Sequence, residues 1–378
     1  MSAIEPFHLA IAEEQLVDLN RRLDATRWPE REPVEDDSQG ARLAAVQALC
    51  HYWRHDYDWR RCETMLNGFG QFRTEIDGLG IHFLHIRSPH ADAIPLLLTH
   101  GWPGSVIEFH KVIGPLSDPT AHGGDRRDAF HLVIPSLPGY GFSDKPRETG
   151  WGVNRIARVW TELMRRLGYD DFVAQGGDWG ASVTTALGVQ RPAALRAIHL
   201  NMPCVFMRPE DLVDPTPEET KMAEATKRFF QQGSGYAAQQ STRPQTLGYG
   251  LTDSPAGQAA WIYEKLTAWS DCGGDPTNIF SFDEMIDNIM LYWLPAAGTS
   301  SARLYWESLP DRDAATVDLP TGCSMFPKEI ARSSRRYIDR KYTNIVYWNE
   351  LDRGGHFAAF EQPGLFTDEL RACFRSLR

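Results

Sequence analysis

The 378-residue sequence lacks the features that mark membrane and secreted proteins. No uninterrupted apolar run reaches the roughly 18 residues that a membrane-spanning helix needs. Residues 1–16 contain Glu5, His8, Glu13 and Glu14, so this stretch has neither the basic start nor the apolar core of a signal peptide. These absences predict a cytoplasmic protein that does not associate with a membrane.

Cysteine is scarce, and its spacing shows no motif. No Cys-x-x-Cys pair is present, which argues against both a zinc site and a small disulfide scaffold. We expect the cysteines to be reduced and mostly buried; they are Cys50, Cys62, Cys204, Cys272, Cys323 and Cys373.

Basic residues are fewer than acidic ones, which gives a net charge of -11. Phosphate backbones and anionic membrane surfaces attract basic proteins and repel acidic ones. The charge therefore argues against nucleic acid as a partner. We also found no internal repeat and no low-complexity tract.

Local patterns change along the chain, which has enough apolar residues (42%) to bury a large core. Residues 1–75 show helical spacing and are expected to form a helical extension without strands. From Phe72 onward, short apolar runs alternate with helical segments, which predicts a mainly parallel sheet covered on both faces. The expected strands are 81–86, 95–99, 130–134, 172–175, 195–200, 317–324 and 345–348, and the expected helices include 13–23, 41–57, 105–116, 153–168 and 181–191.

Residues 203–310 interrupt this alternation with prolines, glycines and amphipathic helices. Strands resume only at Val317, so the segment is an insertion within the α/β core. Such a late insertion usually forms a lid. We therefore expect a helical lid at 203–310 between two core segments, 76–202 and 311–378.

The strongest motif is a glycine-rich turn around Asp178. An apolar strand at 173–175 leads into the G-x-D-x-G run 176–180, and a helix is expected from Ala181. Small residues permit the sharp turn of a nucleophile elbow, which exposes the central side chain above the sheet. A carboxylate there can attack saturated carbon, as in an epoxide or an alkyl halide. The alternative is a plain glycine-rich turn in which Asp178 caps the helix.

A second motif, H-G-W-P-G at 100–104, follows the expected strand 95–99. In a hydrolase with such an elbow, this loop supplies one N–H of the oxyanion hole and the residue after the nucleophile supplies the other. Trp102 and Trp179 are therefore expected to donate from their backbones. The alternative is an ordinary Pro-Gly turn. His100 is expected to be an orienting, hydrogen-bonded histidine rather than a proton shuttle.

A third motif lies near the C-terminus, where the last expected strand runs into G-G-H-F at 354–357. The chain order nucleophile, acid, histidine is the order of α/β-hydrolases. His356 is therefore the expected base, and Glu329, which follows the preceding strand, is the acid expected to orient it. Asp352 is too close to His356 in sequence, and Asp318 lies at the far end of the strand.

No cofactor or metal is expected. His51 and His55 have the spacing of a metal-binding pair on a helix. Because no third ligand is nearby in the sequence, a solvated helix face is the favoured interpretation.

Together, the motifs resemble those of the microsomal-type epoxide hydrolase family, a branch of the α/β-hydrolases with an N-terminal helical meander. The similarity runs through nearly the whole chain, from Pro6-Phe7 and Trp28-Pro29 to the G-G-H-F-A-A-F run at 354–360. The resemblance implies an α/β-hydrolase fold with a mainly parallel, eight-stranded sheet, and a meander over 1–75. It also implies that the substrates are a small-molecule epoxide, of unspecified size, and water.

The resemblance further implies a mechanism. Asp178 would form a covalent ester with the substrate, and water activated by His356 would hydrolyse this ester to a vicinal diol. In the family, an acid in the Phe-Pro-x-Glu segment orients the histidine, which matches Glu329 at the end of 326–329.

Two lid tyrosines hold the epoxide oxygen in that family, and the matching positions here are Tyr236 and Tyr305. Tyrosine is also an ordinary packing residue, so a purely structural role stays open for each. Tyr263 and Tyr292 are the other candidates in the lid.

Two other functions fit parts of the pattern. A haloalkane dehalogenase also uses an Asp nucleophile followed by Trp, but it has no need of paired tyrosines. An inactive relative that serves as a ligand receptor would keep the fold alone, whereas the Asp, Glu and His set is intact. The choice of epoxide, a role in detoxification or natural-product biosynthesis, and a homodimeric state stay open at this point.

Overall fold

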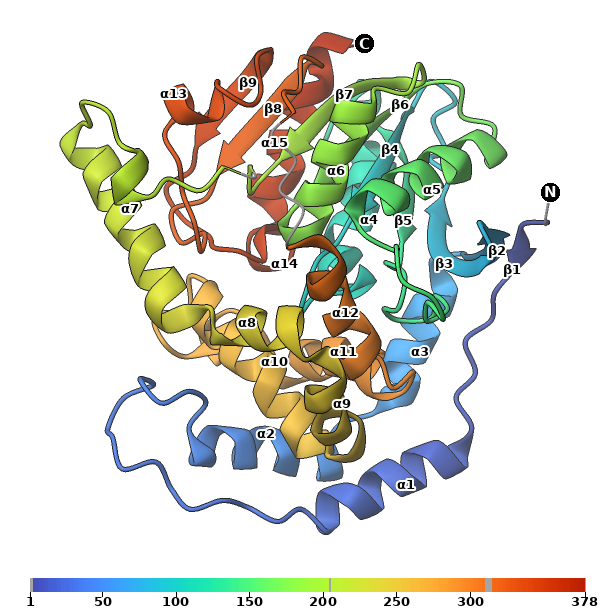
Figure 1. Ribbon diagram of the computed structural model, residues 1–378. Coiled ribbons are helices and arrows are strands. Elements are labelled where there is room, and N and C mark those ends of the chain that lie inside the picture. Colours follow the sequence, from blue (N-terminus) through green and yellow to red (C-terminus); the bar gives the residue numbers. More distant parts are fainter. Residues whose placement is uncertain (1–2, 204, 310–314, 378) are drawn as a thin grey trace.

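The computed structural model describes residues 3–203, 205–309 and 315–377, and strands in this part of the chain form one sheet. Its spatial order is β1-β2-β3-β5-β4-β6-β7-β8-β9 (Figure 1). Neighbouring strands run parallel from β5 to β9 in this order, and those from β1 to β5 pair antiparallel. The expected mainly parallel sheet is confirmed. The strands are β1 (Glu5–Pro6), β2 (Gln71–Ile76), β3 (Leu79–Ile86), β4 (Ile94–Thr99), β5 (Phe130–Pro135), β6 (Phe172–Gly176), β7 (Leu195–Leu200), β8 (Thr321–Met325) and β9 (Ile345–Glu350).

The sheet has nine strands in the described residues, one more than the eight predicted. The expectation that residues 1–75 lack strands was wrong, because β1 lies there and β2 begins at Gln71. A two-residue strand is too short to show an alternating pattern. Pro6 also suits the sheet edge, since it has no N–H to donate to a second neighbour.

The strand expected at 317–324 is shorter in the structure, where β8 begins at Thr321. Pro320 precedes it and has no N–H for the ladder. Val317 instead forms an isolated bridge with Tyr342. The Phe326–Glu329 segment therefore follows the end of β8 directly.

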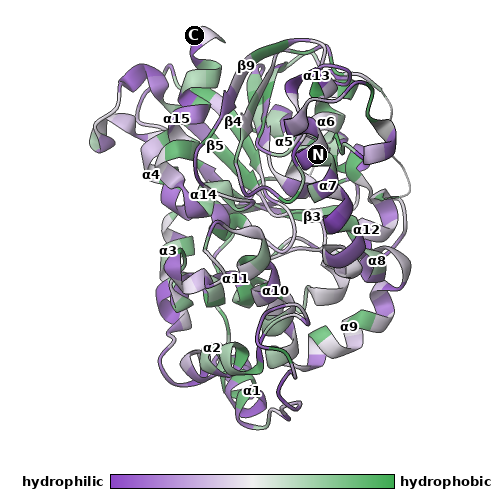
Figure 2. Cartoon of the chain, turned by 90° about the vertical axis from the view of Figure 1, so that its left-hand side faces the viewer, coloured by the Kyte–Doolittle hydropathy of each residue, from purple (hydrophilic) through white to green (hydrophobic). Residues whose placement is uncertain are grey.

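Helices cover both faces of the sheet. On one side lie α4 (His110–Ser117) and α15 (Pro363–Phe374), and on the other α5 (Val153–Arg166) packs beside α6 (Asp178–Gln190). Figure 2 shows the apolar strands β4 and β5 between these layers. Every residue of β5 is buried, as expected for a strand covered on both faces.

The lid helices lie beyond one end of the sheet, with the N-terminal helices of residues 13–24 and 43–55 at their outer side (Figure 1). The lid contains α7 (Pro217–Arg228), α8 (Gly235–Thr242), α9 (Pro244–Asp253), α10 (Pro255–Trp269), α11 (Phe282–Trp293) and α12 (Gly298–Ser308). The N-terminal helices are α1 (Glu13–Asp24), α2 (Leu43–His55) and α3 (Trp59–Gly68). The division of the chain into meander, core and lid stays a prediction, and its boundary at 310–311 lies outside the described residues.

Five of the six cysteines lie in the described part of the chain. Cys204 lies outside the described residues, and the other five cysteines are buried and free: Cys50, Cys62, Cys272, Cys323 and Cys373. None of the helices described is long and apolar enough to cross a membrane.

Asp287 of α11 joins the N-terminal helices to the lid. Its side chain is only 3% exposed, and its oxygens lie 2.7 and 2.9 Å from an Arg61 nitrogen. The Tyr57 hydroxyl also donates to it at 2.7 Å. Burial raises the pKa of Asp287, whereas these hydrogen bonds favour its ionised form. The charge of Asp287 is therefore compensated by groups from the first part of the chain.

Arg61→Met should leave this buried carboxylate without its cation. Because Arg61 itself is 41% exposed, water can replace part of the interaction, and we expect a loss of about 1–3 kcal/mol in the free energy of unfolding. Urea denaturation measures this loss. As a control, Arg54→Met removes a solvent-screened pair with Asp24 and should cost clearly less stability than Arg61→Met. Equal losses in the two variants would contradict the role given to Asp287.

Candidate active site

Asp178 stands where β6 turns into α6. Its φ is +50°, a left-handed conformation that is costly for a residue other than glycine. Two glycines make the turn possible: a Cβ at Gly176 would overlap the Gly180 carbonyl, and a Cβ at Gly180 would overlap the Thr99 carbonyl. The strand-turn-helix context expected of G-x-D-x-G is therefore present, and the side chain of Asp178 keeps 13% of its surface exposed.

The H-G-W-P-G loop meets this turn at the carboxylate. The backbone N–H of Trp102 donates to Asp178 Oδ1 at 2.7 Å. A Cβ at Gly101 would collide with the Asp178 side chain, so the close approach depends on glycine at this position. The loop thus presents one of the two expected backbone donors to an oxygen of Asp178.

His356 lies between the two acids that the sequence singled out. Its Nε2 is 3.5 Å from Asp178 Oδ2, and its Nδ1 is 2.7 Å from Glu329 Oε1. The side chain of Glu329 is fully buried, and Oε1 also accepts a hydrogen bond from the Ile330 N–H. The loops after β6, β8 and β9 therefore bring the three predicted residues together.

Burial and nearby negative charge have opposite effects on the pKa of His356. Burial lowers its pKa, but the charge of Glu329 and hydrogen bonding and charge from Asp178 outweigh this effect and hold the pKa well above its usual value. The imidazolium form is thus favoured while Asp178 carries its charge.

The other sequence candidates lie elsewhere. Asp318 pairs with Arg191 at 2.6 Å on the surface. His100 is buried: its Nδ1 is 2.9 Å from the Gly101 carbonyl, and its Nε2 accepts from Leu137 N at 3.2 Å. Burial lowers its pKa to about 4, so it stays neutral.

The two histidines with metal-like spacing are exposed on α2, with ring centroids 4.6 Å apart. Among the residues that the structure describes, no group of three or more metal-type side chains is present. His51 and His55 therefore have no third ligand there.

Tyr236 of α8 and Tyr305 of α12 meet above the elbow, with ring centroids 5.7 Å apart. Tyr236 stacks on Trp102 at 4.9 Å, and Tyr305 packs edge-on against Trp179 at 4.8 Å. Burial and the nearby charge of Asp178 raise the pKa of both phenols. The Tyr305 hydroxyl is buried without a hydrogen-bond partner among the described groups. Both tyrosines therefore carry neutral phenols that can donate.

The two other lid tyrosines that the sequence offered as candidates are placed differently. Tyr292 donates its hydroxyl to the Gly104 carbonyl at 2.7 Å. Tyr263 lines a separate cavity beside Arg42 and Asp275. The geometry thus distinguishes Tyr236 and Tyr305 from these alternatives.

Comparison with known proteins identifies the family to which the chain belongs. The family model described as "Epoxide hydrolase N terminus" matches residues 4–109, and the one described as "alpha/beta hydrolase fold" matches residues 94–292. A Stigmatella aurantiaca protein named "Putative epoxide hydrolase" is 59% identical over 99% of this chain and 86% of its own length. "Epoxide hydrolase 1" of Sus scrofa is 35% identical over 98% of this chain and 88% of its own length. The chain belongs to the epoxide hydrolase family.

A solved structure of Aspergillus niger epoxide hydrolase shares the fold of this epoxide hydrolase. The TM-score is 0.90 at 33% identity, with 100% of this chain and 97% of that chain covered. The predicted α/β-hydrolase fold and the predicted enzyme class are both confirmed.

Sequence analysis of this epoxide hydrolase missed two residues that hold His356 in place. The Trp269 carbonyl accepts the His356 N–H at 2.9 Å, and the Trp269 ring lies 4.9 Å from the imidazole. Glu361 accepts the N–H groups on either side of His356, from Gly355 and Phe357, both at 2.9 Å. Trp269 reaches His356 from a distant lid helix, whereas Glu361 follows closely in sequence and makes a local contact with the backbone around His356.

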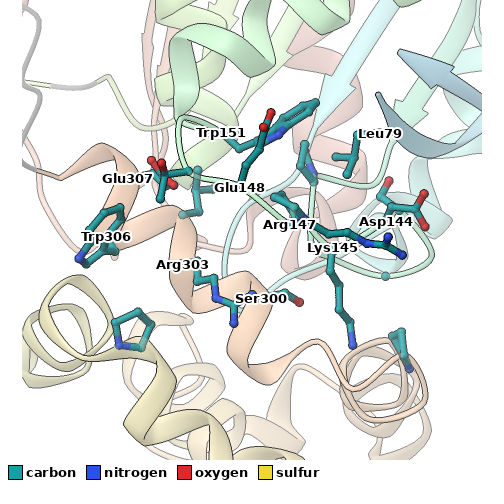
Figure 3. Close-up of a pocket in the computed structure, with 18 of the residues that line it drawn as sticks. Leu79, Asp144, Lys145, Arg147, Glu148, Trp151, Ser300, Arg303, Trp306 and Glu307 are labelled. Carbon is teal, nitrogen blue, oxygen red and sulfur yellow. The ribbon is translucent and has the colours of Figure 1, made fainter. Parts of the chain in front are cut away.

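A cavity of about 1720 Å³ in the described part of the epoxide hydrolase lies apart from these residues. Figure 3 shows its wall, with Ser300 and Arg303 on α12 facing the segment that carries Lys145 and Arg147. Neither Asp178 nor His356 lines it, and Tyr305 is absent from its wall although Leu304 is part of it. Helix α12 therefore separates this cavity from the candidate active site.

Proposed function

We propose that Asp178 opens the epoxide by direct attack while Tyr236 and Tyr305 bind the epoxide oxygen. This proposal rests on one observation: a carboxylate, a histidine–acid pair and two buried phenols lie together in the candidate active site. Asp178 Oδ2 attacks one ring carbon, because Oδ1 is held by the Trp102 N–H. The C–O bond breaks, a phenol supplies a proton to the developing alkoxide, and the product is an ester on Asp178.

Hydrolysis of this ester returns Asp178 to its ionised form. His356 Nε2 takes a proton from water, and the resulting hydroxide attacks the ester carbonyl carbon. The Trp102 and Trp179 N–H groups stabilise the oxyanion. The ester C–O bond then breaks and the diol leaves with the proton from His356, while Glu329 stabilises the imidazolium between these steps. The proton that hydrolysis leaves on the Asp178 carboxyl group passes to His356, which restores the ionised Asp178 and the imidazolium of the free enzyme.

Ester formation itself prepares His356 to act as a base. The charge of Asp178 is one of the causes that raise the pKa of His356 in the free enzyme. The ester is neutral, so this contribution disappears and the pKa of His356 falls. The imidazolium then gives up its proton, which restores the phenol that protonated the alkoxide, and the neutral histidine can accept a proton at the step that needs a base.

His356→Gln tests the second half of this mechanism. Alkylation should proceed, because it needs no base, whereas ester hydrolysis should slow by about 100- to 10,000-fold. Rapid-quench mass spectrometry with styrene oxide should show one covalent adduct that maps to Asp178 and persists. Glu329→Gln should slow the same step less. Normal diol release from His356→Gln in a single turnover would show that another group is the base.

A further inference from the structure

Glu108 is a buried carboxyl group next to the catalytic residues, and the mechanism above leaves it unused. It lies in the short helix Val106–Phe109 that follows the H-G-W-P-G loop, and its N–H donates to the Ser105 carbonyl at 3.1 Å. A Cβ at Gly104 would overlap the Glu108 carboxylate. The loop that presents the Trp102 donor therefore leaves room for the Glu108 side chain.

Glu108 shares a cavity of about 20 Å³ with Asp178 and His356. This volume is sufficient for one water molecule, which needs two to four polar partners. Gln175 also lines the cavity, and its Oε1 is buried without a hydrogen-bond partner among the described residues. The wall thus offers polar groups at the site where ester hydrolysis consumes a water molecule.

The cavity reaches Asp178 from a different side than the epoxide does in the proposed mechanism. Neither Tyr236 nor Tyr305 is part of its wall, whereas Gly101, Gly177 and other residues of the core are. A water molecule held there would approach the ester without displacing the alcohol that the tyrosines bind.

The pKa of Glu108 depends on the charges of the neighbouring catalytic residues. Burial raises its pKa to about 8; Asp178 and Glu361 add to the increase, and His356 opposes it. Formation of the neutral ester removes the contribution of Asp178, and protonation of His356 lowers the pKa of Glu108. The Glu108 carboxylate, a hydrogen-bond acceptor only, is therefore favoured as His356 takes the proton of the water molecule.

We propose that Glu108 is a further catalytic residue, which accepts a hydrogen bond from the water molecule that His356 deprotonates. The inference depends on the roles proposed for Asp178 and His356. One hydrogen of the water passes to His356 Nε2, while the other stays on the attacking oxygen and is directed by Glu108. The oxygen bonds to the ester carbonyl carbon, the ester C–O bond breaks, and His356 returns its proton to the diol. Glu108 gains and loses no proton over the step.

Glu108→Gln keeps the size of the side chain but removes its charge. Stopped-flow Trp fluorescence and rapid-quench mass spectrometry with styrene oxide resolve the two half-reactions. We expect alkylation within about threefold of wild type and hydrolysis slowed by about 10- to 100-fold. The adduct on Asp178 should therefore accumulate. Glu108→Asp retains a shorter carboxylate and should recover part of the hydrolysis rate.

Glu369→Gln is the matched control. Glu369 is also buried, but its partners are Ser324, Tyr347 and Asn349, and it lies outside the wall of the catalytic cavity. Both half-reactions of this variant should match wild type.

The outcomes separate this inference from the proposed function. An adduct that forms and decays in Glu108→Gln at wild-type rates would overturn the role of Glu108 alone. Equal slowing of both half-reactions with a lowered melting temperature would assign Glu108 a structural role and also overturn the inference. Turnover by wild type without any adduct on Asp178 would overturn both proposals.

Discussion

Asp178→Asn should abolish epoxide turnover and prevent formation of the covalent ester. An amide is a poor nucleophile, so the loss should reach at least about four orders of magnitude, as for other catalytic nucleophiles. The substitution keeps Oδ1 as an acceptor for the Trp102 N–H, which is 2.7 Å away in the structure. The fold of the elbow should therefore survive, and the melting temperature should show this.

Initial diol formation from styrene oxide, measured on freshly prepared protein, tests this prediction. Asp318→Asn is the control, because Asp318 is an exposed partner of Arg191 and should leave the rate unchanged. Deamidation of the introduced amide would regenerate the carboxylate and restore activity slowly, together with a mass increase. Immediate wild-type activity without that mass increase would show that Asp178 is not the nucleophile.

The elbow could be predicted from the sequence because its physical requirements are local. A left-handed residue between a strand and a helix requires small neighbours, and Gly176 and Gly180 supply them in a run of five residues. The positions of Glu329 and His356 follow from strand order, because the loops after parallel strands meet at one edge of the sheet. Both residues could therefore be predicted although they are far from Asp178 in sequence.

Residues that act through packing could not be found in the same way. Glu108 comes close to Asp178 because Gly104 leaves space for its carboxylate. Trp269 and Glu361 reach His356 from a lid helix and a C-terminal helix. Trp269 is far from His356 in sequence, and Glu361 is near it but belongs to no motif that points to this role. The edge strand β1 was missed for a related reason, since two residues carry no periodicity.

Tyr236 and Tyr305 could be predicted from the sequence only in part. Their positions were matched to a family pattern, and only the structure separates them from their neighbours. Tyr292 has its hydroxyl bonded to the Gly104 carbonyl, whereas the Tyr305 hydroxyl has no such bond among the described groups. A buried donor without a partner is costly, so it is a natural place for a substrate oxygen.

Removing both phenols with Tyr236→Phe and Tyr305→Phe should nearly eliminate alkylation. Opening an epoxide places negative charge on oxygen, and hydrogen bonds to it strengthen as the C–O bond breaks. Each single substitution should cost about 2–4 kcal/mol in the alkylation barrier, or about 30- to 1,000-fold in rate. The two losses need not be equal, because the remaining phenol can compensate in part.

The two half-reactions should respond differently to the double substitution. In the proposed mechanism, ester hydrolysis uses the backbone donors of Trp102 and Trp179, so an ester formed during a long incubation should decay at close to the wild-type rate. Because burial and Asp178 raise the pKa of both phenols, alkylation by wild type should also show no loss from phenol ionisation near the usual pKa of about 10. Pre-steady-state measurement on the two single variants and the double variant tests these expectations, with Tyr263→Phe as the control outside the site. An unchanged alkylation rate in the double variant would transfer the role of oxygen donor to another lid residue, with Tyr292 the first to be tested.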